Sequence, residues 1–110
     1  MTSHGSACPL SPGGEFSEDQ LHHLFSALSN DIRLTIVQVL AAREAQAEPY
    51  SISELAEVTG TSRFVTSHHL SILRRTGLVR QSIDGHIRRQ SIDRSTLERV
   101  EDWLYPLLEY

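Results

Sequence analysis

The sequence predicts a mainly α-helical domain that carries one small β-hairpin near its C-terminal end. Apolar residues recur with helical spacing in five segments, and residues that favour helix N-termini precede them. A single Asp84-Gly85 pair separates two extended segments. The 110 residues fit one domain. We expect a disordered arm over 1–15, because it is rich in Ser, Gly and Pro, and a folded domain over 16–110.

The first two helices have clear capping signals. Ser17 followed by Gln20 predicts a capping box at the start of the first helix. The apolar stripe of that helix is Leu21, Leu24, Phe25 and Leu28. Asn30 is a favourable N-cap for the second helix. The buried face of the second helix is Ile32, Ile36, Val39 and Leu40. A polar loop follows and ends at Pro49.

The third helix is short and ends in a tight turn. Ser51 and Glu54 form a capping box, or Ser53 is itself the N-cap. The apolar residues of this helix are Leu55, Ala56 and Val58. Gly60 is a favourable residue for the C-terminal end of this helix. The fourth helix is expected to have begun three residues later. Two short helices joined by such a turn predict a helix-turn-helix.

The fourth helix divides into two halves when residues are placed at about 100° each. One half is polar and holds Arg63, Phe64, Ser67, His68, Ser71, Arg74 and Arg75. The other half holds Val65, Thr66, His69, Leu70, Ile72, Leu73 and Thr76. We expect the second half to pack on the core, so His69 is predicted to be structural. Gly77 supplies the C-terminal stop.

The hairpin is predicted to turn at Asp84-Gly85. This turn would place Arg80 opposite Arg89 and Gln81 opposite Arg88. Like charges directly opposite each other destabilise a strand pair, so this register predicts an anion between the two arginines.

The last helix is expected to begin at a third capping box, formed by Ser95 and Glu98. Its apolar residues are Leu97, Val100, Trp103, Leu104, Leu107 and Leu108. Pro106 should end or kink the helix. This apolar surface is large for the terminal helix of a small domain, and a second copy of the chain is the simplest partner for it.

Charge is unevenly distributed along the chain. The formal net charge is −4, and all ten basic residues are arginines. Residues 61–94 hold seven arginines and two aspartates, a net charge of +5, which leaves −9 for the rest. A positive segment in an acidic protein predicts contact with a polyanion and would orient the protein as it approaches.

The order of elements resembles a winged helix-turn-helix, in which the hairpin is the wing. The motifs resemble those of the ArsR/SmtB family of bacterial regulators over roughly residues 17–108. They are residues 28–40 (LSNDIRLTIVQVL), 54–60 (ELAEVTG), 67–79 (SHHLSILRRTGLV) and the Asp84-Gly85 turn. The resemblance implies a homodimer, built from the first and last helices, that binds an imperfect palindrome. It also implies the fourth helix in the major groove and the wing over the backbone or minor groove.

The resemblance supplies a set of expected DNA contacts. These are Ser62, Arg63, Phe64, Ser67, His68, Ser71, Arg74, Arg75, Arg80, His86, Arg88 and Arg89. The arginines late in the fourth helix and in the wing would contact phosphates, whereas Arg63, Ser67 and His68 would reach base edges. Phe64 replaces the small polar residue usual in the family; it either touches a thymine methyl or folds back onto the protein. The expected dimer interface is Leu21, Leu24, Phe25, Leu97, Val100, Trp103, Leu104 and Leu107.

Both metal sites of the family have lost ligands in this sequence. Ser51 and Ser53 stand where one site has Cys-x-Cys, and serine is a poor ligand for soft metals. The second site would fall on Asp93, Ser95, Pro106 and Glu109, so both of its histidines are missing. The remaining candidates for zinc or nickel are His4, Cys8, His22 and His23. We favour the interpretation without a metal or other cofactor, because His4 and Cys8 lie in the arm expected to be disordered. His22 and His23 point in neighbouring directions on one helix and not to one shared position.

Other classes of function fit less well. The chain has no nucleophile elbow, glycine-rich phosphate loop or closed metal triad, so we do not expect an enzyme. A winged-helix module that docks proteins without binding DNA is the alternative, but it would not need the positive segment.

The start of the chain does not resemble a signal peptide and no apolar run approaches ~20 residues, so we expect a cytoplasmic protein without a membrane partner. The expected partners are double-stranded DNA, a second copy, and a protein that supplies the missing sensory function.

Overall fold

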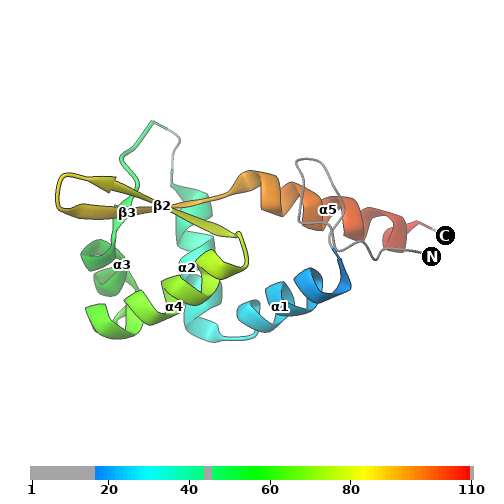
Figure 1. Cartoon of the computed structure of the whole chain (residues 1–110), viewed down its shortest axis with the longest axis horizontal. Helices are drawn as coiled ribbons and strands as arrows, with labels where there is room; N and C mark the ends of the chain where they lie inside the picture. The colour runs from blue at the N-terminus through cyan, green and yellow to red at the C-terminus, as the bar shows by residue number, and fades with distance from the viewer. Residues whose placement is uncertain (1–16, 44–45, 110) are drawn as a thin grey trace.

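The computed structural model describes residues 17–43 and 46–109, in which five helices accompany a three-stranded antiparallel sheet. The helices are α1 (Glu18–Leu28), α2 (Asp31–Ala42), α3 (Ile52–Thr59), α4 (Arg63–Arg75) and α5 (Arg94–Leu108). The strands are β1 (Tyr50–Ser51), β2 (Val79–Asp84) and β3 (Ile87–Ile92), in the order β1-β3-β2. The hairpin β2-β3 extends from one end of the helical body, and α1 and α5 lie at the other (Figure 1). The arm predicted over 1–15 lies outside the described residues.

The predicted starts of the first three helices are confirmed. Ser17 Oγ accepts a hydrogen bond from the Gln20 backbone N–H at 3.1 Å, and the Gln20 side chain accepts one from the Ser17 N–H at 2.8 Å. Asn30 Oδ1 accepts from the first backbone N–H groups of α2. Ser51 and Glu54 form the reciprocal capping box, which decides against the alternative cap, Ser53, two residues on. These caps satisfy donors that the helices themselves leave unpaired.

The prediction for the start of the last helix was wrong. Asp93, not Ser95, is the N-cap of α5. One carboxylate oxygen of Asp93 accepts from both the backbone N–H and the hydroxyl of Ser95, at 3.0 and 2.6 Å. Asp93 satisfies two donors at once, so it outcompetes the hydroxyl that follows it. The helix also runs past Pro106 to Leu108, so the proline does not end it.

The predicted register of the hairpin was also wrong, by two residues. The loop residues are Gly85 and His86, and Asp84 pairs with Ile87. Gly85 has a φ of 63°, and the first residue of a two-residue loop is where a type II′ turn requires positive φ. As a result Arg80 lies opposite Ser91 and Arg89 opposite Ser82, so no arginine pair faces across the hairpin.

The core lies between α1, α2, α3, α4 and the start of β2. Its buried residues are Leu24, Ala27, Ile36, Leu40, Ile52, Leu55, Leu70, Leu73, Leu78 and Val79. Val58, one of the three apolar residues named for α3, is 52% exposed, whereas Leu55 and Ala56 are buried. Two-residue β1 was not predicted, and it pairs with β3 through Tyr50 and Ser51. Strand β1 joins the loop after α2 to the sheet, directly before the first turn of α3.

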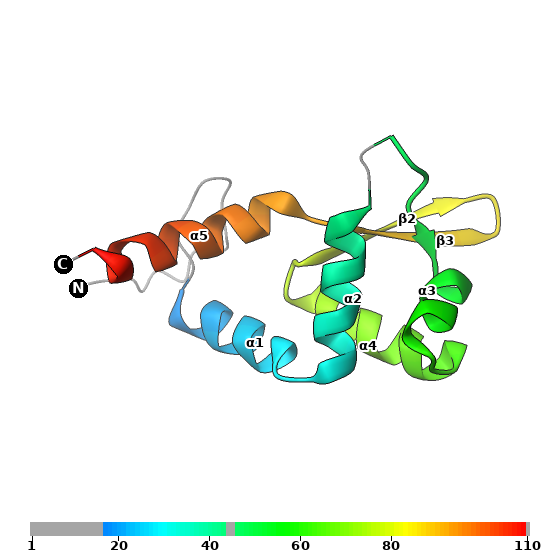
Figure 2. The ribbon, with the colours of Figure 1, turned by 180° about the vertical axis from the view of Figure 1, so that it is seen from behind.

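Helix α5 packs on the core through Leu97 and Val100 and touches α1 at Trp103. It leaves the end of β3 and runs beside α1, away from the hairpin (Figure 2). The Phe25 and Trp103 rings touch, with centroids 5.5 Å apart, yet every residue from 101 to 109 is exposed. The radius of gyration is 15.2 Å, against about 13 Å for a compact domain of this length.

Within residues 17–43 and 46–109, no single helix is both long and apolar enough to cross a membrane. Only α1 and α2 taken together pass that test, and they meet at a bend of 98°.

Candidate nucleic-acid interface

The two halves of α4 lie as the sequence predicted, apart from one residue. The buried side chains of α4 are Thr66, His69, Leu70 and Leu73. Val65, expected on the packing half, is 36% exposed at the first turn. Ser62 caps the helix, because its Oγ accepts from the Val65 N–H at 3.1 Å. The opposite half forms a polar surface that begins with Arg63 and ends with Arg75.

A chain of threonine hydroxyls holds the turn between α3 and α4. Thr59 Oγ1 donates to the Leu55 carbonyl at 2.8 Å and lies 3.1 Å from Thr61 Oγ1. Thr61 Oγ1 in turn lies 2.7 Å from Thr66 Oγ1, which is fully buried. Gly60 closes α3 with a φ of 72°, a conformation that glycine adopts without steric cost. These contacts fix the angle at which α4 leaves α3.

Two glutamines connect the end of α4 with the wing. Gln90 is fully buried, and its Nε2 donates to Gln81 Oε1 at 2.9 Å across the β2-β3 pair. Arg74 Nη1 donates to Gln90 Oε1 at 3.2 Å. Burial lowers the pKa of Arg74, and the nearby charge of Arg88 lowers it further. Arg74 is therefore anchored to the sheet and is not a freely moving surface charge.

Arg89, predicted as a phosphate contact, is enclosed by acidic groups of its own chain. Its side chain is only 12% exposed, and its nitrogens lie 3.5 Å from Glu48, 3.9 Å from Glu54 and 3.8 Å from Asp84. Arg89 Nη1 also donates to the Pro49 carbonyl at 3.0 Å. The hydrogen bond from the Ser51 backbone N–H lowers the pKa of Glu54, and the charges of Arg43 and Arg89 add to this. Arg89 thus holds the wing against the start of α3.

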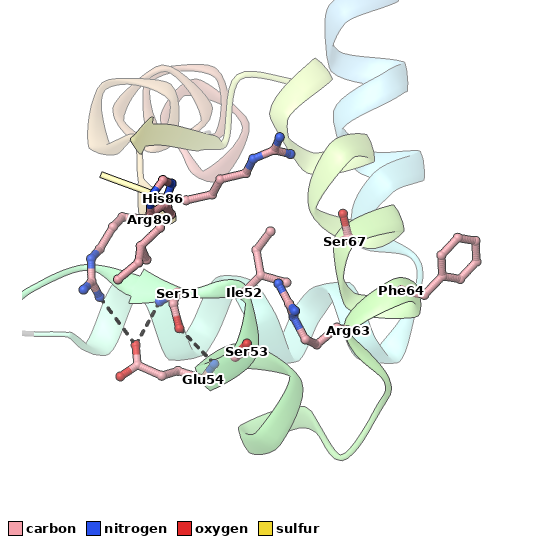
Figure 3. A pocket seen from close by; sticks show the side chains of 11 residues that line it. Ser51, Ile52, Ser53, Glu54, Arg63, Phe64, Ser67, His86 and Arg89 are labelled. Carbon is pink, nitrogen blue, oxygen red and sulfur yellow. Dashed lines mark hydrogen bonds and ion pairs between the residues drawn. The ribbon is translucent and has the colours of Figure 1, made fainter. Parts of the chain in front are cut away.

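A groove of about 630 Å³ lies between the wing and the first turns of α3 and α4. Its lining includes Arg63, Ser67, His86 and Arg88, whose charges and hydrogen-bonding groups suit an anionic backbone. The Arg63 side chain turns toward this groove, whereas Phe64 lies at its edge with its ring extending outward from the protein (Figure 3). At 83% exposure, Phe64 does not fold back onto the chain.

The predicted DNA contacts fall into two groups in the structure. The exposed members are Ser62, Arg63, Phe64, His68, Arg75, Arg80, His86 and Arg88. The partly buried members are Ser67, Ser71, Arg74 and Arg89. Ser71 Oγ donates to the His68 carbonyl at 2.8 Å, so its hydroxyl is used within the helix. The exposed positive charges gather on α4 and the wing.

The residues predicted for the dimer interface are also divided. Phe25, Trp103, Leu104 and Leu107 are between 39% and 61% exposed. Leu21, Leu97 and Val100 are half-buried. Leu24, by contrast, is 1% exposed and belongs to the core of the chain, so it has almost no surface to offer a second copy. The exposed residues form one apolar surface on α5 and the adjoining side of α1.

His69 is the one histidine of α4 that faces inward. Arg33 Nη1 lies 3.1 Å from His69 Nδ1, and since a guanidinium only donates, this nitrogen accepts. Burial lowers the pKa of His69, and the positive charges of Arg33 and His68 lower it further. The neutral imidazole therefore belongs to the hydrogen bonding of the core, as the sequence predicted.

The residues at the family's two metal sites do not fit a metal ion. The Ser51 hydroxyl is occupied as a helix cap, and Asp93 caps α5. Within the described part of the chain, no three His, Cys, Asp or Glu side chains come together as a metal would require. His22 and His23 have ring centroids 5.9 Å apart at 72° to each other, and His23 Nδ1 is 2.8 Å from the Asp19 carbonyl oxygen. His4 and Cys8 lie outside the described residues.

Comparisons with known proteins agree with this architecture. Residues 30–81 match the family described as bacterial regulatory protein, arsR family. No curated protein matches the sequence. The chain is similar to the crystal structure of an ArsR family transcriptional regulator, with a TM-score of 0.72 and 25% identity over 87% of this chain and 94% of that one.

Two further structures show the same similarity. An ArsR-like transcriptional regulator from Rhodococcus sp. RHA1 has a TM-score of 0.67 and 28% identity, over 81% of this chain and 79% of that one. A homodimeric winged helix-turn-helix DNA-binding domain from Mycobacterium bovis has a TM-score of 0.62 and 26% identity, over 80% and 79%. Its solution structure is described as that of a possible ArsR-family regulator. We conclude that residues 30–81 match the arsR family of bacterial regulatory proteins and that the chain shares the winged helix-turn-helix fold of solved ArsR-family transcriptional regulators.

Proposed function

We propose that this protein is a homodimeric repressor that binds an imperfect palindromic operator. Helix α4 of each protomer enters the major groove, and the wing lies over the adjacent backbone or minor groove. The observation that carries the proposal is the exposure of Arg63 and Arg75 on α4 and of Arg88 on the wing of an otherwise acidic chain. The second copy covers the apolar surface of α1 and α5, as the homodimeric Mycobacterium bovis relative suggests.

The proposed contacts divide by role. Arg75 and Arg88 bind phosphates, which supplies salt-dependent affinity with little choice of sequence. Arg80 points to the face of the hairpin opposite to that of Arg88, so it is not grouped with them. Arg63 lines the groove beside the wing and contacts the backbone there. Arg74 acts from its fixed position on Gln90, with its remaining nitrogens available to a phosphate. Arg89 is not part of the proposed contact set, because its own acidic partners neutralise it.

Release from DNA by a metal ion is not part of the proposal. The side chains that would bind the metal are serines or helix caps. The signal is instead proposed to come from another ligand or from a partner protein. The DNA-competent state is then the metal-free dimer.

Fluorescence anisotropy on the chain's own upstream DNA tests this proposal. We expect tight binding in the presence of a chelator, with an affinity that falls steeply between two salt concentrations. The Arg75→Ala/Arg88→Ala double variant should bind more weakly and with a smaller salt dependence. Binding that appears only after zinc or nickel is added would contradict the metal-free state. Absence of binding under both conditions would favour the protein-docking alternative.

A further inference from the structure

Phe64 is the most exposed large apolar side chain in the described part of the chain, at 83%. It is the second residue of α4, and the first turn of a recognition helix is the part that reaches base edges in helix-turn-helix complexes. The exposure of an apolar ring at this place on the proposed DNA-binding surface therefore suggests that the ring contacts DNA.

The direction of the ring points to bases and away from phosphates. With Arg63 placed at zero and about 100° per residue, the polar half of α4 spans roughly 140°, and Phe64 lies inside its two edges, at about 100°, which is about 30° from its middle. Arg63 and Arg74 lie on the flank toward the wing, and His68 and Arg75 on the other flank. A helix in the major groove turns its central line to the base edges and its flanks to the two backbones.

The side chains that neighbour Phe64 on this half of α4 are polar. Ser67 and Ser71, three and seven residues further along the helix, carry small side chains, and the exposed His68 lies four residues on. The Ser71 hydroxyl is already bonded to the His68 carbonyl. The ring therefore stands out from a surface that offers few other side chains to the bases.

A single apolar ring on a cationic surface fits DNA better than a protein partner. Protein interfaces require a contiguous patch, and the residues around Phe64 supply polar and charged groups instead. In the major groove the 5-methyl group of thymine is the apolar feature that distinguishes one base pair from the others. An aromatic ring gains from contact with that methyl and has no hydrogen bond to offer a different base.

We propose that Phe64 is a specificity-determining residue that contacts a 5-methyl group, that of thymine in unmodified DNA, in each half of the operator. The inference rests on the proposed DNA-binding function and names what the exposed surface of α4 recognises. Two-fold symmetry of the dimer requires two such thymines, one per half-site, at equal distances from the centre.

The test begins by selecting the preferred sequence of the full chain from a pool of random DNA duplexes. Each thymine of the selected duplex is then replaced, one at a time, by deoxyuridine, which removes one methyl and leaves base pairing unchanged. Burial of one methyl is worth about 0.8 kcal/mol, so we expect about a fourfold loss of affinity at one position in each half-site. Replacing both thymines should multiply the two losses to about 15-fold, because the positions are far apart.

Variants of Phe64 show whether the ring is the group that senses the methyl. Phe64→Ala should bind the thymine and deoxyuridine duplexes equally well, whereas Phe64→Leu should keep part of the difference. Val65→Ala, a change on the other half of the same helix turn, should keep all of it. Thermal unfolding should be nearly the same in the three variants, since Phe64 is 83% exposed and Val65 lies at the exposed first turn.

The outcomes separate this inference from the function on which it rests. Salt-sensitive binding with equal responses to deoxyuridine in the wild type and Phe64→Ala would overturn the role of Phe64 and leave DNA binding intact. If the selection enriches no sequence and binding is absent at low salt, the proposed function fails, and the methyl contact fails with it.

Discussion

Arg88 and Arg89 are neighbours in β3 with opposite environments. Successive side chains of a strand point to opposite faces of a sheet. Arg88 reaches the open side of the groove and is exposed, whereas Arg89 turns toward Glu48, Glu54 and Asp84. One guanidinium is available to DNA and the other is committed to the fold.

Alanine substitution of each arginine should separate these roles. Arg88→Ala should leave the free energy of unfolding within ~0.5 kcal/mol of the wild type and should lower the salt dependence of DNA binding by about one phosphate per protomer. Arg89→Ala should destabilise the chain by about 1–3 kcal/mol, because hydrogen bonds to a charged group are lost and three carboxylates lose their counter-charge. Urea unfolding at fixed protein concentration and anisotropy titrations at several salt concentrations measure the two effects. Equal loss of stability in both variants would contradict the assignment.

His69 should make the stability of the chain depend on pH. Its pKa is lowered in the folded state by burial and by Arg33 and His68, so the unfolded chain binds a proton more readily. The stabilisation is fully present above the unfolded pKa of about 6.5 and is lost as the pH falls toward the lower folded value. His69→Gln keeps an acceptor for Arg33 but cannot be protonated, so its stability should fall less between pH 7 and pH 5. Parallel urea unfolding curves of both proteins over that range test this; identical pH profiles would rule it out.

At the scale of elements, the turn between α3 and α4 is held by side chains as well as by backbone geometry. The Thr59, Thr61 and Thr66 hydroxyls form one chain that leads into the buried side of α4. The orientation of α4 relative to α3, and so to the wing, depends on this small polar cluster within the core.

Thr66→Val should loosen that turn. Valine keeps the shape of the side chain but removes the hydroxyl that meets Thr61, at a cost of about 1 kcal/mol of stability. Thr35→Val is the matched control, because the Thr35 hydroxyl bonds only the Asp31 carbonyl within α2 and is exposed. It should change the free energy of unfolding by less than ~0.5 kcal/mol. Chemical denaturation of both variants decides the point, and an unchanged Thr66→Val protein would show that the hydroxyl chain is dispensable.

The sequence predicted those elements whose signals are local. Helix caps depend on residues two or three apart, which is why Ser17, Asn30 and Ser51 were identified correctly. Where two local signals competed, the prediction failed: Asp93 outcompeted Ser95, and Gly85 took the first loop position of the wing in place of the second. Each failure displaced an element boundary and left the element itself in place.

The candidate site was predictable as a surface but not residue by residue. The polar half of α4 follows from helical periodicity alone. The burial of Arg89 does not, because one of its partners, Glu48, lies 41 positions away in the sequence and another, Asp84, meets it only in the observed register. The buried Gln90, which ties Arg74 to the sheet, had no signal in the strand pattern for the same reason.

At the scale of the whole molecule, the two proposed functional surfaces lie on different parts of the chain. The cationic surface comprises the exposed sides of α4 and the wing, and the apolar surface comprises α5 with part of α1 (Figure 1). Leu107 and Leu108 are 61% and 70% exposed near the end of α5. A single chain leaves this half of the helix uncovered, which favours pairing with a second copy.

Leu107→Glu should convert the proposed dimer to a monomer. A carboxylate on the apolar surface would lose its hydration when a second copy covers it. Sedimentation equilibrium should then give a mass near 12.4 kDa, against twice that value for the wild type. Glu98→Lys, on the polar side of the same helix, should stay dimeric. A wild-type protein that is monomeric at micromolar concentration would contradict the proposed assembly.

The uncovered half of α5 also has a consequence for protein turnover. If order in residues 101–109 comes from assembly, the fraction of chains with a frayed C-terminal end rises as the concentration falls, by mass action. Frayed ends are preferred sites of proteolysis. Newly made or diluted protomers would then be degraded faster than assembled ones. The same helix that joins two copies would in this way set a lower limit on the concentration at which the regulator persists in the cell.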